Sequence, residues 1–306
     1  MLNSNWKKEE KSRCIMVGTY NDSLIHLKDE RKLSYREYGD TNENTVLFFH
    51  GFGSSAGAIH PDPNILDANN IRFFAVNRPG YGASDLAANY SPEDFADTVN
   101  DFLMAKNIDK ASIIGWSAGG LYSQVFAEKY PERVSSLNLV SSAIPLNSKE
   151  TRNILPSNWK MISSMNRYLP ILTKYFFKSF SKKLTKDLDS AIQESINQMV
   201  EEDKKVANDP IMKPAIIRGA VESYHNRGLG VYSDARALCK NISTKAQPLL
   251  DTKVNIWQGS EDNVWTPAAS EYLRQRYPAS TYSFIEKEGH LLYLSHWNEI
   301  LKKAVE

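Results

Sequence analysis

The 306-residue sequence predicts an α/β domain in which a mostly parallel sheet is flanked by helices and interrupted by one inserted helical segment. Short apolar runs with strand character alternate with longer runs whose apolar residues have helical spacing. Polar or glycine-rich loops follow the apolar runs. Loops of this kind are typical of the carboxyl ends of the strands in a parallel sheet. The alternation stops between residues 145 and 230, where only helical patterns occur. Alternating strands and helices favour right-handed crossovers and hence a parallel sheet.

The N-terminal part of the chain predicts a hairpin followed by two buried strands. Residues 1–13 are polar and charged, and we expect them to be a frayed lead-in. A polar turn joins strands expected over residues 23–28 and 33–38, which favours an antiparallel pair. The continuous apolar runs at residues 45–49 and 71–76 are typical of strands buried on both faces.

A helix is expected next, over residues 92–106. Ser91 is placed as its N-cap and Pro92 at its first position, and acidic residues occupy the first turn. Two further strands are expected over residues 110–114 and 134–140. Between them, apolar side chains at helical spacing predict a helix up to Pro131.

The helical patterns of residues 145–230 predict a cap inserted into the core. Helices are expected over residues 157–166, 169–180, 187–203 and 214–226. The alternation then resumes, with strands over 254–257 and 281–286 and helices over 267–277 and 291–305. The predicted domains are therefore a core of residues 14–144 and 231–306 and a cap of residues 145–230.

The segment Gly115-Trp116-Ser117-Ala118-Gly119 lies between a predicted strand and a predicted helix. The glycines let the two backbones approach closely, since they carry no β-carbon. A serine in such a strand-to-helix turn forms a nucleophile elbow. The helix N-terminus directs free N–H groups and a positive dipole end at charge that develops beside the serine. The sequence therefore predicts Ser117 as a nucleophile.

A serine hydroxyl needs an adjacent base, and the sequence predicts His290 in that role. His290 follows the last predicted strand, so it should lie at the same edge of the sheet as Ser117. The other histidines are less favourably placed: His26 in an early strand, His50 at the start of a loop, His60 in a proline-rich loop, His225 in the cap and His296 inside the last helix.

The acid that orients this base is expected in the turn Gly259-Ser260-Glu261-Asp262-Asn263, which follows a predicted strand. Asp262 is the predicted acid, and its neighbour Glu261 is the alternative. The strand after the elbow is another place for such an acid, but Ser141-Ser142-Ala143 offers no carboxylate there. That absence favours Asp262.

A tetrahedral intermediate needs two N–H donors near its oxyanion. The backbone of Ala118, directly after the serine, is expected to supply one. The loop His50-Gly51-Phe52-Gly53 is expected to supply the other, from the amide of Phe52. Because the donor is a backbone group, the phenylalanine side chain is no objection.

These motifs together resemble the α/β-hydrolase fold family over nearly the whole chain. The resemblance rests on the residues just named, on their chain order Ser, Asp, His, and on Arg78-Pro79-Gly80-Tyr81-Gly82-Ala83-Ser84. It implies an eight-stranded, mostly parallel sheet with a helical cap between the sixth and seventh strands. The motifs are specific for the fold but not for the substrate.

Departures from the family's subgroups narrow the expected chemistry. The loop at His50 differs from the His-Gly-Gly-Pro-Gly of proline iminopeptidases, which argues against peptidase activity. A serine nucleophile argues against haloalkane dehalogenase and soluble epoxide hydrolase chemistry. Nothing in the chain resembles the His-Gly-Gly-Gly loop of lid-bearing lipases.

We therefore expect a serine hydrolase that forms an acyl-enzyme and needs no metal or organic cofactor. Its small-molecule substrate is expected to be a small or medium, largely apolar carboxylester, thioester or lactone. Alternatives within the same fold are a carbon–carbon hydrolase or a cofactor-free perhydrolase. A small-molecule receptor with little turnover is the alternative from another functional class.

The substrate is expected to contact Trp116, Tyr175, Phe176 and Tyr224. Two of these lie in the aromatic segment 169–180, whose side chains we expect to line the pocket and pack the cap on the core. The alternative is that this segment is a basic amphipathic helix on a membrane surface.

Composition excludes several other classes. The 37 lysines and arginines nearly balance 36 aspartates and glutamates, so no bulk field favours nucleic acid or an anionic membrane. No apolar run reaches the length of a transmembrane helix, and Met1–Arg13 lack the apolar stretch of a secretory signal. We expect a cytoplasmic protein without stable membrane insertion, in which Cys14 and Cys239 are free thiols rather than a pair. The oligomeric state stays open.

Overall fold

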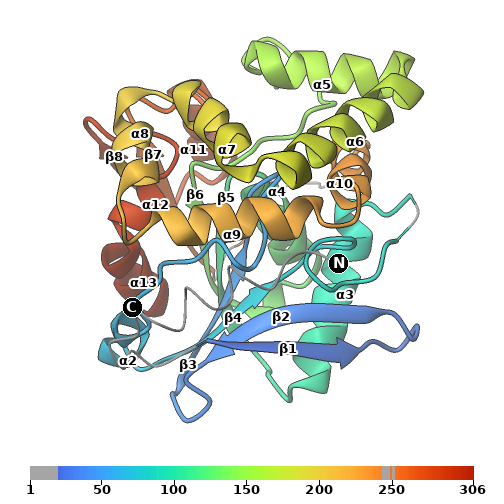
Figure 1. The fold of residues 1–306 in the computed structure, drawn as a ribbon. Helices are drawn as coiled ribbons and strands as arrows, with labels where there is room; N and C mark the ends of the chain where they lie inside the picture. The colour runs from blue at the N-terminus through green and yellow to red at the C-terminus, as the bar shows by residue number, and fades with distance from the viewer. Residues whose placement is uncertain (1–19, 88, 243–248, 250–251) are drawn as a thin grey trace.

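The computed structural model describes residues 20–87, 89–242, 249 and 252–306. Within them, one eight-stranded sheet has the order β1-β2-β4-β3-β5-β6-β7-β8. β1 and β2 pair antiparallel, and β2 pairs antiparallel with β4, whereas the pairs from β4 through β3 to β8 are all parallel. The predicted fold class, a mostly parallel eight-stranded sheet flanked by helices, is thus confirmed (Figure 1).

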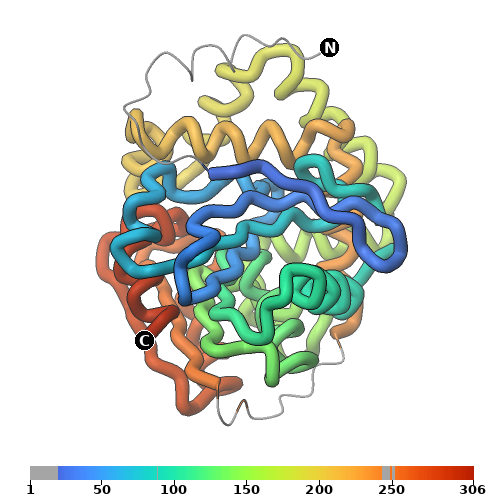
Figure 2. Tube along the Cα trace, turned by 90° about the horizontal axis from the view of Figure 1, so that it is seen from below, coloured from blue at the N-terminus to red at the C-terminus, as the bar shows by residue number. Residues whose placement is uncertain are grey.

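The strands lie within two residues of the predicted bounds at every end. They are β1 Asn21–His26, β2 Lys32–Tyr38, β3 Asn44–Phe49, β4 Ile71–Val76, β5 Ala111–Trp116, β6 Val134–Val140, β7 Lys253–Gly259 and β8 Thr281–Ile285. Seen from below, β1 and β2 run across the front of the molecule, and the C-terminal elements lie to one side (Figure 2). The antiparallel hairpin therefore forms one edge of the sheet and β8 the other.

Helices cover both faces of the sheet. On one face, α3 (Pro92–Ala105), α4 (Ala118–Lys129) and α11 (Pro267–Arg276) pack against side chains such as Leu47 and Phe49. On the other face, α2 (Asn64–Ala68), α12 (Leu292–Ser295) and α13 (Trp297–Val305) pack against side chains such as Val46 and Phe48. These alternate residues of β3 are fully buried, as expected for a central strand covered on both sides. A 3₁₀ turn, Pro131–Arg133, leads into β6.

Helices fill the segment between β6 and β7. They are α5 Ser157–Tyr168, α6 Pro170–Lys186, α7 Leu188–Asn197, α8 Glu201–Asn208, α9 Lys213–Tyr224 and α10 Leu229–Leu238. In Figure 1 they lie together above the sheet, with α5 and α6 at the top. The helical character predicted for residues 145–230 is present, while their division into a separate cap stays a prediction.

Several details differ from the sequence-based expectation. The helix expected over residues 187–203 is two helices, because Gln198–Val200 interrupt it. α10 was not expected, because Gly228 and Gly230 resemble a turn; yet Gly230 allows a close approach, since a β-carbon there would lie 2.2 Å from the Gly80 carbonyl oxygen. His296 is not inside a helix, because it separates α12 from α13.

Of the two cysteines predicted to be free thiols, the structure describes one. Cys239 is free and half-buried at the end of α10. Cys14 and the predicted lead-in, residues 1–13, lie outside the described residues. No helix in the described ranges has both the length and the apolar character needed to cross a membrane.

Candidate active site

Ser117 lies at the sharp turn between β5 and α4. Its backbone angles are φ 56° and ψ −126°, a region that residues with a β-carbon rarely adopt. The turn depends on Gly119, because a β-carbon there would lie 1.9 Å from the carbonyl oxygen of Phe49. The predicted nucleophile elbow is therefore present, with the serine held in a strained conformation at the start of a helix.

The structure brings Ser117, His290 and Asp262 into one hydrogen-bonded line. His290 Nε2 lies 2.9 Å from Ser117 Oγ, and His290 Nδ1 lies 3.0 Å from Asp262 Oδ2. All three side chains are buried. The carboxylate has no proton to donate, so Nδ1–H donates to it and the Nε2 lone pair faces the serine hydroxyl. This tautomer lets the imidazole accept a proton from Ser117.

Two backbone amides hold the carboxylate of Asp262 in position. Its Oδ1 accepts hydrogen bonds from the amides of Val264 at 2.9 Å and Trp265 at 3.0 Å, which leaves Oδ2 for the histidine. The alternative acid, Glu261, is exposed and accepts a hydrogen bond from Ser260 instead. Of these two neighbours, Asp262 is the one hydrogen-bonded to His290.

A second carboxylate, Asp203 of α8, lies beside His290. Its Oδ1 accepts a hydrogen bond from the Leu291 amide at 2.7 Å. Burial lowers the pKa of His290, but the Asp262 carboxylate and its hydrogen bond, followed by the charge of Asp203, raise it above the usual value overall. Burial in turn raises the pKa of Asp203. Sequence analysis missed Asp203, because Glu201-Glu202-Asp203 has the pattern of a solvated first turn.

The loop that follows β3 lies directly against Ser117. A β-carbon on Gly51 would lie 3.2 Å from the Ser117 β-carbon. Within the part of the chain that the structure describes, the amides of Phe52 and Ala118 donate no hydrogen bond. Both predicted oxyanion donors are therefore available to a ligand oxygen beside the serine.

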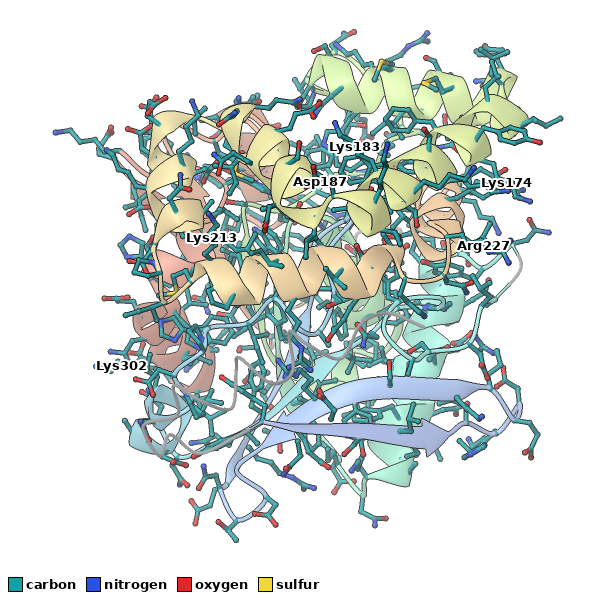
Figure 3. The ribbon with its side chains drawn as sticks, in the orientation of Figure 1. Lys174, Lys183, Asp187, Lys213, Arg227 and Lys302 are labelled. Carbon is teal, nitrogen blue, oxygen red and sulfur yellow. The ribbon has the colours of Figure 1, made fainter. Side chains whose placement is uncertain are left out.

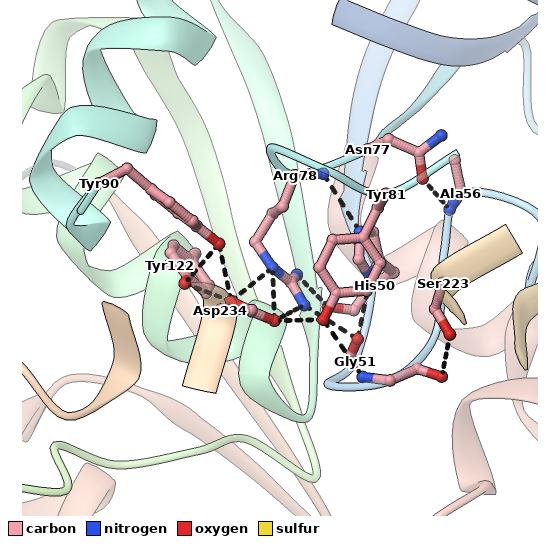
Figure 4. Close-up of polar contacts among 11 residues, drawn as sticks. His50, Gly51, Ala56, Asn77, Arg78, Tyr81, Tyr90, Tyr122, Ser223 and Asp234 are labelled. Carbon is pink, nitrogen blue, oxygen red and sulfur yellow. Dashed lines mark hydrogen bonds and ion pairs between the residues drawn. The ribbon is translucent and has the colours of Figure 1, made fainter. Parts of the chain in front are cut away.

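Arg78, which follows β4, holds this loop through hydrogen bonds to its carbonyl oxygens (Figure 4). Its side chain is fully buried and donates to the carbonyl oxygen of His50 at 2.5 Å and to that of Gly51 at 3.0 Å. The Gly51 carbonyl and the Phe52 N–H belong to one planar trans peptide, so they point in opposite directions. The hydrogen bond from Arg78 to the Gly51 carbonyl therefore fixes the direction of the Phe52 N–H.

The charge of Arg78 is matched by Asp234 of α10, also fully buried. The guanidinium lies 2.8 Å from Asp234 Oδ2, and the carboxylate also accepts hydrogen bonds from three tyrosines: Tyr81, Tyr90 and Tyr122. Burial lowers the pKa of Arg78, but Asp234 and the neighbouring tyrosines together raise it above its ordinary value, so the cation is retained. Sequence analysis singled out Arg78 only as part of a motif and missed Asp234, since its helix was not expected.

The four predicted substrate contacts have different surroundings. The Trp116 side chain is buried and supports the His290 loop, because its Nε1 donates to the His290 carbonyl at 2.9 Å. Tyr224 lies beside the loop, with its hydroxyl 3.7 Å from a β-carbon placed on Gly53. Tyr175 and Phe176 are 62% and 57% exposed, so the expectation that they pack inward is wrong.

The helical phase of α6 explains this correction. Thr173, Phe177, Ser181 and Leu184 are its buried residues, and this spacing turns Tyr175 and Phe176 outward. Phe177 is the aromatic residue that faces the site, with its ring 5.7 Å from that of Phe52. The Trp159 ring of α5 lies 5.5 Å from the Phe52 ring, so the three rings form an apolar cluster.

Comparison with known proteins agrees with this geometry. A family model described as the alpha/beta hydrolase fold matches residues 44–296, a span that includes the elbow, the turn of Asp262 and His290. The chain belongs to the alpha/beta hydrolase fold family. The family predicted from the motifs is therefore confirmed, and the prediction of a hydrolase is supported by relatives that are named esterases.

Named relatives include a pimeloyl-[acyl-carrier protein] methyl ester esterase of Chromobacterium violaceum, 24% identical over 85% of this chain and 92% of that protein. A solved esterase of Thermogutta terrifontis has a TM-score of 0.63 at 20% identity, covering 94% of this chain and 100% of its own. An enol-lactonase of Burkholderia xenovorans has a TM-score of 0.65 at 17% identity, covering 92% and 98%. At these identities the structural neighbours establish the fold alone.

Proposed function

We propose that this alpha/beta hydrolase cleaves esters through an acyl-enzyme formed on Ser117. The observation that carries the proposal is the hydrogen-bonded line from Ser117 Oγ through His290 to Asp262, with distances of 2.9 and 3.0 Å. The esterase names of several relatives support ester hydrolysis as the reaction class. Among the residues that the structure describes, no cluster of three or more His, Cys, Asp or Glu side chains is placed to hold a metal ion.

In the proposed reaction, His290 Nε2 removes the proton from Ser117 Oγ as that oxygen attacks the ester carbonyl. Asp262 holds the imidazole in the required tautomer and stabilises the imidazolium that forms. The imidazolium then protonates the leaving alkoxide, and the acyl group remains on Ser117. A water molecule repeats the sequence, with His290 as its base, and releases the acid.

The amides of Phe52 and Ala118 are proposed to bind the oxyanion of each tetrahedral intermediate. The support is their position beside Ser117 and the absence of another acceptor for them among the described residues. Ala118 is the first residue of α4, where free amides and the helix dipole favour negative charge. Arg78 contributes by holding the peptide that carries the Phe52 amide, so little reorganisation is needed during the reaction.

The proposed substrate class is a small or medium, largely apolar acyl ester, thioester or lactone. The rings of Trp159 and Phe177 pack against that of Phe52 in this loop, and the three rings favour apolar groups. Each methylene added to the acyl chain should strengthen transition-state binding by no more than about 1–3 kcal/mol until the pocket is full. This gain is measured as an increase in kcat/KM.

The test combines labelling with turnover. Wild-type protein should react with a fluorophosphonate at Ser117 and hydrolyse p-nitrophenyl esters in a series from acetate to laurate. A matched series of anionic esters should be poorer. Absence of labelling would contradict the acyl-enzyme and favour a binding protein, whereas a strong preference for the anionic series would contradict the apolar substrate class.

A further inference from the structure

Residues 151–186, which contain α5 and α6, carry eight lysines and arginines and no aspartate or glutamate. The rest of the chain has 29 such cations against 36 carboxylates. The near-neutral net charge therefore conceals a strong local excess of positive charge. This excess is concentrated on two helices at the outer side of the molecule, where Lys174 and Lys183 are labelled in Figure 3.

The same helices expose large apolar side chains. We call these the apolar corner, because they lie around the junction of α5 and α6 and along the first half of α6. They are 49–70% exposed: Met161, Tyr168, Leu169, Ile171, Leu172, Tyr175 and Phe176. Single exposed apolar residues are common on proteins, but a group of this size on two adjoining helices indicates an interaction surface.

A basic pocket continues the surface along the second half of α6. It has a volume of about 400 Å³ and is lined by Lys178, Ser181, Lys182, Thr185, Lys186, His225 and Arg227. Among the described residues, no carboxylate forms an ion pair with Lys178, Lys182, Lys186 or Arg227. Cations without an acidic partner form a suitable site for a phosphate group.

We propose that the apolar corner and the basic pocket together dock this protein on an anionic phospholipid bilayer. Apolar and aromatic side chains beside lysines are the composition of a helix that lies in the interface between headgroups and acyl chains. In this arrangement the corner enters the interface while lipid phosphates occupy the pocket. Anionic lipid is the occupant that the charge excess favours. Its headgroups bind a positive surface, and its acyl chains accept apolar side chains.

The docking surface is connected to the candidate active site through α6. Phe177 on its inner face contacts Phe52 of the oxyanion loop, while its neighbour Phe176 is exposed on the outer face. A bilayer bound to the corner would therefore contact the same helix that forms one wall of the site. The proposal does not depend on the chemistry at Ser117, since binding is measured without turnover.

The experiment is co-sedimentation of the full chain with vesicles of phosphatidylcholine alone or of equal parts phosphatidylcholine and phosphatidylglycerol. We expect binding to the mixed vesicles that weakens as salt is added, and much weaker binding to phosphatidylcholine. The double variant Ile171→Ser/Leu172→Ser should lose at least about tenfold in affinity. The variant Lys182→Gln/Lys186→Gln should lose about fivefold per cation removed.

Two exposed residues elsewhere provide matched controls. Ile211→Ser removes an apolar side chain that is 62% exposed, and Lys302→Gln removes a cation of α13 (Figure 3). Both controls should bind vesicles as the wild type does. All of the variants replace surface residues, so their thermal unfolding should match that of the wild type.

Three results would overturn the proposal. Failure of the wild type to bind mixed vesicles at low salt is the first. Full binding by Ile171→Ser/Leu172→Ser would show attraction by charge alone, which an acidic protein partner would satisfy equally well. A concentration-dependent dimer in sedimentation velocity that this variant abolishes would identify a second copy of the chain as the occupant.

Discussion

The region around Ser117, at the carboxyl ends of the parallel strands, and the outer face of α5 and α6 both differ from the usual pattern of residue burial, but in opposite ways. At the sheet edge, ionisable groups such as Arg78, Asp234 and Asp262 are almost fully buried, and each is held by several hydrogen bonds. On the outer face, large apolar side chains such as Ile171 and Leu172 are exposed, and lysines of α6 such as Lys178 form no ion pair with a carboxylate of the described residues. Both arrangements cost stability relative to the usual distribution, in which apolar groups are buried and charges are solvated.

The difference indicates two kinds of function. The buried polar groups are fixed in position, as a chemical step requires, because reacting atoms must be aligned before the reaction begins. The exposed apolar groups are only partly covered by the described chain, as an association surface requires. Substitutions should therefore separate the two regions, with effects on catalysis and folding at one and on vesicle binding at the other.

The largest separation should come from Ser117→Ala and His290→Ala. Either change should lower kcat/KM for a water-soluble ester by at least about a thousandfold, because the remaining groups provide only binding and oxyanion stabilisation. Asp262→Asn should retain more activity. Steady-state kinetics and fluorophosphonate labelling give the measurement, with Ile171→Ser/Leu172→Ser as the control that keeps wild-type turnover. Labelling of another serine in Ser117→Ala would contradict the assignment.

The next effect concerns folding. Arg78→Met leaves the buried Asp234 carboxylate without its cation and should lower the free energy of unfolding by about 3–5 kcal/mol. Arg78→Met/Asp234→Asn removes the uncompensated charge and should be less destabilised than Arg78→Met. Lys174→Met, at an exposed position of α6, should change stability by no more than about 0.5 kcal/mol. Urea unfolding measures all three, and equal stabilities would contradict the role of the buried pair.

A smaller effect is expected at the oxyanion loop. Phe52→Pro removes the backbone N–H and should lower kcat by about 10²–10³-fold, whereas Phe52→Ala keeps the donor and should cost much less. Circular dichroism would establish that both variants fold. Equal losses in kcat would show that the side chain matters and that the second donor lies elsewhere.

The smallest effect concerns pH. The pKa of His290 is raised above its ordinary value of about 6.5, so kcat/KM should increase with pH through that raised pKa, as the imidazole loses its proton. Since the charge of Asp203 contributes to the increase, Asp203→Asn should move the profile to lower pH. The asparagine side chain still offers an oxygen to the Leu291 amide. An unchanged profile would exclude electrostatic coupling between α8 and the histidine.

The same pKa shift predicts a change in stability with pH. A histidine whose pKa is higher in the folded state stabilises the fold below its unfolded pKa, and this contribution is lost as pH rises through the folded pKa. Unfolding free energies of wild type and Asp203→Asn over weakly acid to weakly alkaline pH give the measurement. The variant should lose less stability across this window.

Much of this architecture could be predicted because the determining signals are local in the sequence. The strands of the parallel sheet are continuous apolar runs, and Ser117, Asp262 and His290 each follow one of them. The capping box of Ser91 and Asp94 fixed the start of α3. In a parallel sheet, residues that follow strands converge on one edge, so three local patterns were enough to assemble the proposed site.

The features that were missed or misplaced depend on packing between distant segments. The exposure of Tyr175 and Phe176 depends on which face of α6 meets the core, and amphipathic spacing alone did not determine that face. Asp203 and Asp234 have the sequence context of solvated helix residues, and only tertiary packing buries them. α10 was missed because Gly228 and Gly230 resemble a turn, and the close contact between Gly230 and Gly80 has no signature within its own segment.

The backbone strain at Ser117 implies a conflict between durability and activity at this position. Its positive φ is accessible to glycine at little cost but costs a residue with a β-carbon about 1–3 kcal/mol. Elsewhere in folded proteins, alanine is usually the more stabilising of the two small residues. Here Ser117→Gly should melt at a higher temperature than Ser117→Ala, although both are inactive. Selection for heat resistance alone would therefore replace the serine, and the strained residue persists only while turnover is required.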